Sequence, residues 1–469
     1  MATSCTFCTA ADREPCVPDA GISRRQCLAA LGTGLAGLTL PSFSDAAPRR
    51  QPNIVLIVAD DLGSTDLGCY GADDLRTPHL DALAARGVRF TDHYVTAPAC
   101  TPSRASLLTG REHARVLQRN VGLEAEETTL AELLGGNGYR TAIFGKWHLG
   151  IPADHSPQSQ GFDEFMGFKV GALDNYSHTY HWGAGVGHRL WKDDAAYHEE
   201  GTYFPDLVTR EATAFIDRNH RRPFFLYLPY NQPHYPIQPT TASLQAVAHI
   251  EEPGRRHYAA CVQVLDEAVG RVVAAIEAQG LSEDTIILFL SDHGHSIEEE
   301  SLGCGRIWPC GPGGRATPYS GHKGTLAEGG IRVPCIASWP GHYPQGVVRQ
   351  QLVSSLDWLP TLADAAGLST TGLVLDGQPL GPVITSSTAT VHAALCWTYG
   401  MLWAVREGRW KLMGSGADDI SLYDLELDPG ERVNQLAERQ DLFRHLAGVR
   451  NRWAESLRHD PTVIRELGL

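Results

Sequence analysis

The chain has 469 residues, of which 43% are hydrophobic and 20% are charged, and its formal net charge is −15 at pH 7. This composition is typical of a globular protein, and the length predicts a large domain together with a smaller one. The negative charge argues against nucleic acid as a general partner. It does not exclude an anionic substrate, because a site can be locally cationic within an acidic protein.

The first 47 residues resemble an export signal rather than a part of the fold. Arg24 and Arg25 precede a weakly apolar run, residues 27–40, that is too short to span a bilayer, and small residues at 44–47 offer a cleavage region. This pattern resembles a twin-arginine signal, with a chance arginine pair in a disordered tail as the alternative. It predicts export by the Tat machinery to the periplasm or the medium, with no membrane anchor.

The cysteine content only partly agrees with an oxidising compartment. Four of the eleven cysteines lie in the leader, and the remaining number is odd, so at least one is unpaired. Cys304 and Cys310 lie close together in the sequence. They could form a small disulfide loop or remain free thiols.

Two apolar stretches, residues 54–59 and 285–290, each have the pattern of a buried strand that ends in acidic residues. The residues that end these two strands are Asp60, Asp61, Asp292 and His293. Helical patterns separate the strands, which predicts an α/β fold with a mostly parallel sheet. Ligands bind at the carboxyl ends of the strands in such sheets, so both clusters fall where a site is expected.

Paired buried carboxylates are costly unless a positive charge neutralises them. A hard divalent cation does this, and an oxygen-rich ligand set favours calcium or magnesium. The imidazole of His293 leaves zinc or manganese open. An acidic residue that merely begins a loop is the alternative for either cluster taken alone.

The stretch "TAPACTPSRASLLTGR" places Cys100 at the start of a predicted helix, with Thr101 as its N-cap, Pro102 in the first turn and Gly110 at its end. A helix N-terminus favours anions and lowers the pKa of a thiol. Arg104 is expected to face the same spot. The alternative is a buried structural cysteine beside an ordinary capped helix.

Three further stretches place basic or imidazole groups beyond predicted strands or in glycine-rich loops. Lys146 and His148 are two residues apart in "GYRTAIFGKWHLG", so they share a face if the chain there is extended. His234 follows an apolar strand, and Lys323 lies in "GHKGTLAEGG". Together these groups could neutralise a compact oxyanion and move protons.

Several of these stretches resemble the sequence motifs of a known protein family. "CTPSRASLLTGR" is similar to the first sulfatase motif and "GYRTAIFGKWHLG" to the second. "DDLG", "SDHG", "GHKGTLAEGGIRVPCIASWPG" and "LYDLELDPGERVN" also match, in family order, so the resemblance covers about residues 52–436. The chain is identified as a formylglycine-dependent sulfatase of the arylsulfatase and N-acetylgalactosamine-6-sulfatase type.

The resemblance implies an alkaline-phosphatase-like fold, in which helices flank a large, mostly parallel mixed sheet. A catalytic domain is expected over residues 50–370. A smaller α+β domain, with a four-stranded antiparallel sheet and one helix near residues 442–457, is expected over residues 371–469. Within it, Asp428, Pro429 and Gly430 predict a turn, with ligand binding by "LYDLELDPGERVN" as the alternative.

The resemblance also implies the cofactors. A formylglycine-generating maturation enzyme is expected to oxidise Cys100 to an aldehyde, which hydrates to a geminal diol that attacks sulfur. The residues implied to hold one calcium ion, or another divalent metal, are Asp60, Asp61, Cys100, Asp292 and His293. Many relatives have asparagine where this chain has His293, so that ligand and the identity of the metal stay open.

The remaining roles follow from the same motifs. Arg104, Lys146 and Lys323 are implied to neutralise the sulfate, and His234 is implied to lie near the leaving oxygen as an acid. His148 is implied to remove the proton from the second hydroxyl of the diol. The expected reaction is the hydrolysis of sulfate monoesters.

Three alternatives remain. One is a phosphodiesterase or phosphonate monoester hydrolase of the same superfamily, and another is a non-catalytic relative that binds sulfated glycans. A third is a Cys–His hydrolase that uses Cys100 and His148 and needs no metal.

The substrate is predicted only as a class. Two stretches rich in aromatic residues, histidine and glycine, residues 161–183 and 295–320, lie where relatives place substrate loops, and residues 301–320 have the pattern of a flexible insertion. This composition suits a sulfated carbohydrate, and an aryl sulfate stays open.

Overall fold

The computed structural model describes residues 51–118, 122–181, 187–298, 313–416 and 418–458. The export signal with Arg24 and Arg25, both cysteines of the possible disulfide, Cys304 and Cys310, and most of the insertion at 301–320 lie outside these described residues. Residues 50–469 form one compact unit. The expected domain boundary near residue 370 therefore stays a prediction.

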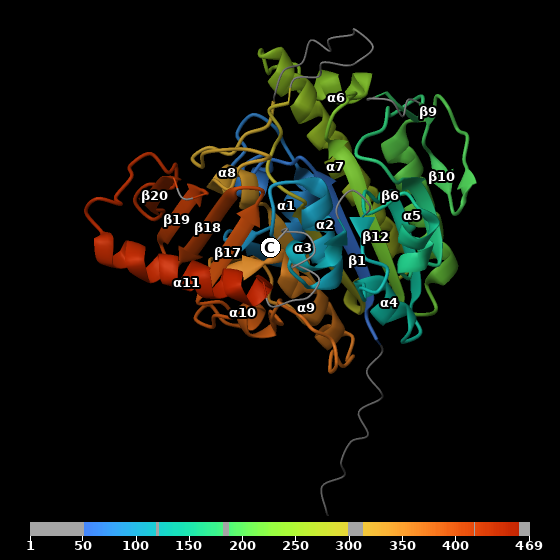
Figure 1. Ribbon diagram of the computed structural model, residues 1–469. Helices are drawn as coiled ribbons and strands as arrows, with labels where there is room; N and C mark the ends of the chain where they lie inside the picture. Colours follow the sequence, from blue (N-terminus) through green and yellow to red (C-terminus); the bar gives the residue numbers. More distant parts are fainter. Residues whose placement is uncertain (1–50, 119–121, 182–186, 299–312, 417, 459–469) are drawn as a thin grey trace, which may run out of the picture. The chain divides into compact units, whose positions relative to one another are not determined.

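The core of the fold is a ten-stranded sheet with the order β11-β10-β7-β6-β12-β1-β13-β14-β2-β15 (Figure 1). Its strands, from one edge to the other, are β11 (Ala195–Ala196), β10 (Trp191–Lys192), β7 (Glu164–Phe168), β6 (Arg140–Lys146), β12 (Phe224–Pro233), β1 (Asn53–Asp60), β13 (Thr285–Ser291), β14 (Cys335–Ser338), β2 (Val88–Phe90) and β15 (Val347–Arg349). The five central strands from β7 to β13 run parallel, whereas β14 and β10 run antiparallel to their neighbours. The predicted mostly parallel mixed sheet is confirmed.

Helices cover both faces of this sheet (Figure 1). The α-helices of the described residues are α1 (Pro78–Ala85), α2 (Cys100–Thr109), α3 (His113–Val116), α4 (Leu130–Gly135), α5 (Phe204–Asn219), α6 (Thr241–Ala246), α7 (Pro253–Ala278), α8 (Glu328–Ile331), α9 (Trp358–Ala365), α10 (Gly381–Thr385) and α11 (Gln440–Arg458). Short two-residue strands form small pairs elsewhere: β3 (His93–Tyr94) with β16 (Val353–Ser354), β4 (Leu117–Gln118) with β5 (Gly122–Leu123), and β8 (Thr179–Tyr180) with β9 (Gly187–His188).

Strand β1 shows why the sheet has two buried faces. Val55 and Ile57 pack in one apolar core with side chains of α1, α5 and α7, whereas Ile54 and Leu56 pack in a second core with α2, α4 and α9. Each of these side chains is fully buried, which stabilises the fold by about 1.5–3 kcal/mol per side chain. Because β1 and β13 are parallel neighbours, their carboxyl ends, and the acidic residues there, meet at one edge.

The C-terminal part contains a second, smaller sheet. Strands β17 (Ala394–Tyr399), β18 (Leu402–Glu407), β19 (Trp410–Ser415) and β20 (Asp418–Asp424) pair antiparallel in chain order. Helix α11, expected near 442–457, contributes Leu446 to the apolar core on one face of this sheet. On the other face, Trp397 packs with Tyr94 and Ile331 from the larger part of the chain. The predicted four-stranded antiparallel sheet with one helix is confirmed.

A buried ionic cluster ties this small sheet to the loop that carries Lys323. Lys411 of β19 is fully buried, and its Nζ lies 2.8 Å from Glu328 Oε1 and 2.8 Å from Glu431 Oε1. Burial alone would lower the pKa of Lys411, but the two carboxylates raise it. Glu431 Oε2 accepts hydrogen bonds from Ser320 Oγ at 2.6 Å and from the Glu328 backbone N–H at 2.9 Å, so it holds both ends of the loop.

Glu431 follows directly after the turn that the sequence predicts. The backbone N–H of Glu431 donates to the Asp428 carbonyl across Pro429 and Gly430, and Asp428 Oδ2 accepts from the next two backbone N–H groups. The turn is therefore confirmed. In addition, it presents a buried carboxylate to the Lys323 loop, a role that the sequence did not reveal.

Replacement of Lys411 by methionine is expected to lower the free energy of unfolding by about 3–5 kcal/mol, because two buried carboxylates would lose their shared cation. Urea-induced unfolding measures this value. The control is Lys192→Met, because Lys192 is 45% exposed and pairs with Glu211 at 3.1 Å. That surface pair is expected to contribute at most about 1 kcal/mol. Equal, small losses for both variants would contradict a stabilising role for the buried cluster.

Candidate active site

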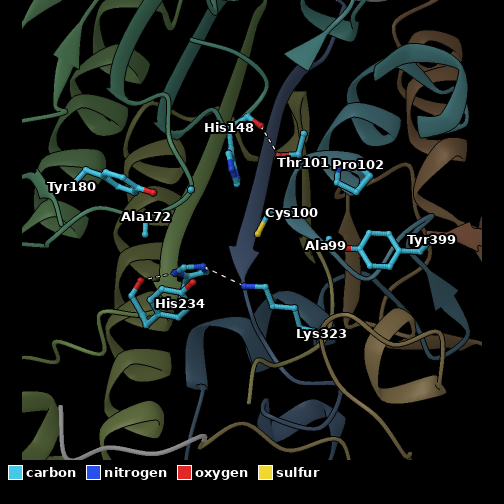
Figure 2. Close-up of a pocket in the computed structure, with 12 residues that line it drawn as sticks. Ala99, Cys100, Thr101, Pro102, His148, Ala172, Tyr180, His234, Lys323 and Tyr399 are labelled. Atoms are coloured by element: carbon cyan, nitrogen blue, oxygen red, sulfur yellow. Dashed lines mark hydrogen bonds between the residues drawn. The ribbon is translucent and has the colours of Figure 1, made fainter. Parts of the chain in front are cut away.

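Helix α2 begins at Cys100, two residues before the predicted first-turn proline. Its N-cap is Ala99, which is extended (φ −151°, ψ 151°) and offers no side-chain cap. The prediction that Thr101 caps the helix is wrong, because its hydroxyl donates instead to the carbonyl oxygen of His148 at 3.0 Å (Figure 2). The helix ends as predicted at Gly110, whose φ of 65° is left-handed. Thr101 thus joins the two long motifs.

Cys100 lies among charged groups at the carboxyl end of β1. Its Sγ lies 3.1 Å from His293 Nε2, 3.3 Å from Lys146 Nζ and 3.6 Å from Asp60 Oδ1. Burial would raise the pKa of the Cys100 thiol, but Lys146, His293 and Lys323 hold it well below its usual range. A negative charge on residue 100 is therefore stabilised here.

Lys146, the last residue of β6, also pairs with Asp60. Its Nζ lies 2.6 Å from Asp60 Oδ2, and both side chains are fully buried. Burial would raise the pKa of Asp60, but the Lys146 ammonium and other nearby cations keep it well below its usual range. The predicted convergence of strand-ending acids with the second motif is therefore present in the structure.

Arg104 takes a different position from the one expected for a sulfate ligand. From one turn into α2, its Nε and Nη2 donate to Asp292 Oδ2 at 3.0 and 2.8 Å, and its Nη1 donates to the Lys146 carbonyl at 3.3 Å. The fully buried guanidinium therefore orients Asp292 and the end of β6. A direct contact between Arg104 and sulfate stays a prediction.

Four residues could hold a metal ion. Asp60, Asp61, Cys100 and His293 each place one ligand atom within 4.8 Å of the others, and all four are buried. Asp61 Oδ1 is buried and accepts no hydrogen bond from the described residues. His293 Nδ1 lies 2.9 Å from the Gly294 carbonyl, so it donates there and its Nε2 is left to face the cluster. The donor set therefore fits a divalent cation.

Asp292, the fifth expected ligand, lies beside this group. Its Oδ2 accepts the two Arg104 hydrogen bonds, and its Oδ1 lies 3.6 Å from His293 Nε2 and accepts from the Asp61 backbone N–H at 3.3 Å. Burial raises the pKa of Asp292 to about 7, against the opposing effect of His293 and Arg104. Its role as a ligand stays a prediction.

Lys323 and His234 both lie close to Asp61. Lys323 Nζ lies 3.2 Å from Asp61 Oδ1, 3.4 Å from His234 Nε2 and 3.1 Å from Glu298 Oε2. Burial would lower the pKa of His234, but Asp61 and Asp60 raise it above its ordinary value. His234 Nδ1 lies 2.5 Å from the Tyr235 carbonyl oxygen, to which it donates, so its Nε2 faces Lys323.

His148 reaches the site by a route that the sequence pattern did not predict. Strand β6 ends at Lys146, and His148 has a left-handed φ of 55°, so the two do not share the face of an extended strand. The side chain passes close over Gly171, where a Cβ would lie 3.1 Å from His148 Cε1. Burial lowers the pKa of His148, and a hydrogen bond with Cys100 opposes this effect.

Of the site residues, Cys100, His148, His234 and Lys323 line a cavity of about 410 Å³. Figure 2 shows Cys100 at its centre, with His148, His234 and Lys323 around it. Two tyrosines flank the cavity from opposite sides: Tyr180 from β8 and Tyr399 from β17. Tyr180 lies in the aromatic stretch expected to contact substrate, but no sequence signal pointed to Tyr399, because it comes from the smaller sheet.

Comparisons with known proteins agree with this geometry. The sulfatase family model matches residues 52–368, and the model for the C-terminal part of N-sulphoglucosamine sulphohydrolase matches residues 322–452. The chain is 36% identical to arylsulfatase A of Homo sapiens, over 85% of this chain and 86% of that protein. It is 34% identical to N-acetylgalactosamine-6-sulfatase of Canis lupus familiaris, over 82% and 74%.

A solved structure of Ps i-CgsB in complex with k-i-k-neocarrahexaose has a TM-score of 0.78 to this one. It is 30% identical and covers 88% of this chain and 94% of its own. Within the part of the chain that the structure describes, no helix is both long and apolar enough to cross a membrane. The family model, the curated relatives and the solved neighbour all point the same way: the chain belongs to the sulfatase family and is a sulfuric ester hydrolase.

Proposed function

We propose that this sulfatase removes sulfate from a sulfated carbohydrate, with a hydrated formylglycine at position 100 and one calcium ion. The observation that carries the proposal is the position of Cys100 Sγ, within 3.6 Å of Asp60, Lys146 and His293 and facing the cavity. A thiolate is poorly matched to carboxylates and a hard cation, whereas a hydrated aldehyde offers oxygen. Conversion of Cys100 by a maturation enzyme resolves that mismatch.

The calcium ion would be held by Asp60, Asp61, His293 and residue 100, with Asp292 beside them. Three carboxylates and one imidazole form a mostly oxygen-donor set, which favours calcium over zinc. When bound, the ion supplies a fixed positive charge next to residue 100. Arg104 keeps Asp292 in place through two hydrogen bonds, so the carboxylates stay oriented.

Four side chains would bind the sulfate and transfer protons during hydrolysis. Lys146 and Lys323 would neutralise the sulfate and fix its orientation. Asp61 and Asp60 raise the pKa of His234 against the effect of burial, which favours the protonated form that can donate a proton to the leaving oxygen. Burial lowers the pKa of His148, so its neutral imidazole can accept a proton from the hydrated residue 100.

The substrate class rests on two of the three tyrosine side chains that line the cavity, Tyr180 and Tyr399, which flank it from opposite sides. Tyrosine rings provide flat apolar faces with a polar end, which suits the alternating apolar and hydroxyl surface of a sugar. The complex of Ps i-CgsB with k-i-k-neocarrahexaose, in a related fold, supports the same substrate class. A small aryl sulfate is the second candidate, because it fits a cavity of about 410 Å³ without contact to both rings.

We further propose twin-arginine export to the periplasm or the medium, based on Arg24 and Arg25.

The first prediction concerns residue 100. A peptide that contains it is expected to show the mass loss of a thiol-to-aldehyde change and to react with a hydrazide. Cys100→Ser, made without a maturase that oxidises serine, is expected to be nearly inactive, whereas Cys261→Ser on α7 is expected to keep both the modification and the activity. Active enzyme in which Cys100 is a fully alkylatable thiol would overturn the proposal and favour a Cys–His hydrolase.

The second prediction concerns the acid. His234→Ala is expected to fold normally and to slow hydrolysis by about 10²–10⁴-fold on sulfates with poor leaving groups, and much less on activated aryl sulfates. Steady-state kinetics on a series of leaving groups measures this difference. The control is His257→Ala, because His257 is half-buried on α7 and does not line the cavity. An equal loss along the whole series would rule out proton donation by His234.

The third prediction concerns the substrate class. Tyr399→Ala and Tyr180→Ala are each expected to raise KM several-fold on sulfated saccharides and to leave KM on a small aryl sulfate nearly unchanged, since a lost ring contact costs about 1 kcal/mol. Met401→Ala is the matched control, because Met401 is 73% exposed in the turn that follows Tyr399. If the tyrosine variants behave like the control on every saccharide that is desulfated, the rings do not recognise sugar.

A further inference from the structure

A second group of potential metal ligands lies away from Cys100, beside the β8–β9 pair. His188, His198 and Glu200 each place one ligand atom within 4.8 Å of the others. His188 is the last residue of β9, and the other two lie in the segment between β11 and α5. The three residues therefore connect two segments that the backbone joins only through β10 and β11.

The hydrogen bonding fixes the orientation of His188. Its Nε2 lies 2.7 Å from the carbonyl oxygen of Tyr197. A carbonyl can only accept, so Nε2 carries the hydrogen, and in the neutral imidazole the Nδ1 lone pair faces Glu200 Oε1 at 3.5 Å. Such a contact between a lone pair and a carboxylate oxygen is favourable only when a proton or a metal cation lies between them. A backbone carbonyl that sets the tautomer in this way is the usual support of a metal-binding histidine.

His198 approaches the same carboxylate oxygen. Its Nδ1 lies 2.8 Å from Glu200 Oε1, and its ring stacks on that of His188 at a centroid distance of 4.2 Å. Ligand atoms around a tetrahedral zinc ion lie about 3.3 Å apart, given bond lengths of about 2.0–2.1 Å. The distances from Glu200 Oε1 to His198 Nδ1 and to His188 Nδ1, 2.8 and 3.5 Å, lie on either side of this value. The His198 side chain, 60% exposed, can tilt out of its stacked position so that both lone pairs converge.

We infer that His188, His198 and Glu200 form a second metal site, which takes a divalent transition-metal ion such as zinc. Two imidazole nitrogens and one carboxylate oxygen suit zinc and are too few oxygens for calcium. The ion replaces the proton between His198 Nδ1 and Glu200. The fourth position is open to water.

The site has a consequence for the substrate cavity, and this part rests on the proposed function. His188 lies opposite Thr179 in the β8–β9 pair, and Gly187 lies opposite Tyr180. An ion that fixes His188 to the segment of His198 and Glu200 also restrains the strand that carries Tyr180, which lines the cavity. Zinc at this site therefore orders one wall of the cavity without contact to the reacting atoms.

Equilibrium dialysis of the tag-free, full-length protein against zinc, with calcium in excess to fill the site around residue 100, tests the inference. The wild type is expected to retain about one equivalent of zinc more than His188→Ala, His198→Ala or Glu200→Gln. His257→Ala and Glu199→Gln are the matched controls, because Glu199 pairs with Arg210 instead. They are expected to bind zinc like the wild type. Equal zinc retention by wild type and all three site variants would overturn the site.

Hydrogen exchange at Thr179 and Tyr180 tests the link to the cavity. Added zinc is expected to slow their amide exchange in the wild type and in Glu199→Gln, but not in His188→Ala. Zinc binding without slower exchange would overturn the ordering of the cavity wall. Neither measurement depends on catalysis, so a failure of the proposed sulfatase mechanism would leave both results interpretable.

Discussion

The neutralisation of buried carboxylates at the carboxyl end of β1 is the constraint on which the site depends. Asp60, Asp61 and Asp292 are at most 2% exposed, and an unpaired buried carboxylate costs several kcal/mol. Lys146 forms an ion pair with Asp60 at 2.6 Å, and Arg104 forms one with Asp292 at 2.8 Å. Lys323 Nζ lies 3.2 Å from Asp61 Oδ1, but that oxygen accepts no hydrogen bond from the described residues, so a bound cation could add a ligand contact there. The ion pairs that stabilise the fold therefore also orient the charged groups around residue 100.

The parts of the site that sequence predicted are those fixed by regular structure. Strands β1 and β13 were expected to be buried and parallel, and their pairing brings the acids of both together. The cysteine at a helix start was also correct, because a short helix followed by Gly110 leaves little choice for the chain. Periodicity and cap residues were sufficient here, since local propensity and tertiary packing favour the same conformation.

The errors arose where a tertiary contact outweighs the local rule. Thr101 is a good N-cap by type, yet its hydroxyl bonds to the His148 carbonyl, so α2 begins one residue earlier than the predicted cap. His148 was expected on an extended face, but its left-handed φ turns it toward Cys100. Tyr399 had no sequence signal, and Glu431 lies in a motif that predicted only a turn, because both residues act on segments that are distant in the sequence. Such contacts are visible only in three dimensions.

The smaller sheet therefore contributes to the site as well as to stability. Lys411 and Glu431 hold the loop of Lys323 from one side, and Tyr399 forms a wall of the cavity. The site is assembled from both ends of the chain, so its geometry depends on the packing of the two sheets.

The most direct test of the central claim is a comparison of kcat/KM on a sulfate monoester and on a phosphate monoester with the same leaving group. The account predicts a clear preference for the sulfate ester, because the cations that face residue 100 are already shared with three carboxylates and would poorly compensate the second charge of a phosphate. Equal or higher kcat/KM on the phosphate ester would contradict it and would assign the same charge cluster to phosphoryl transfer.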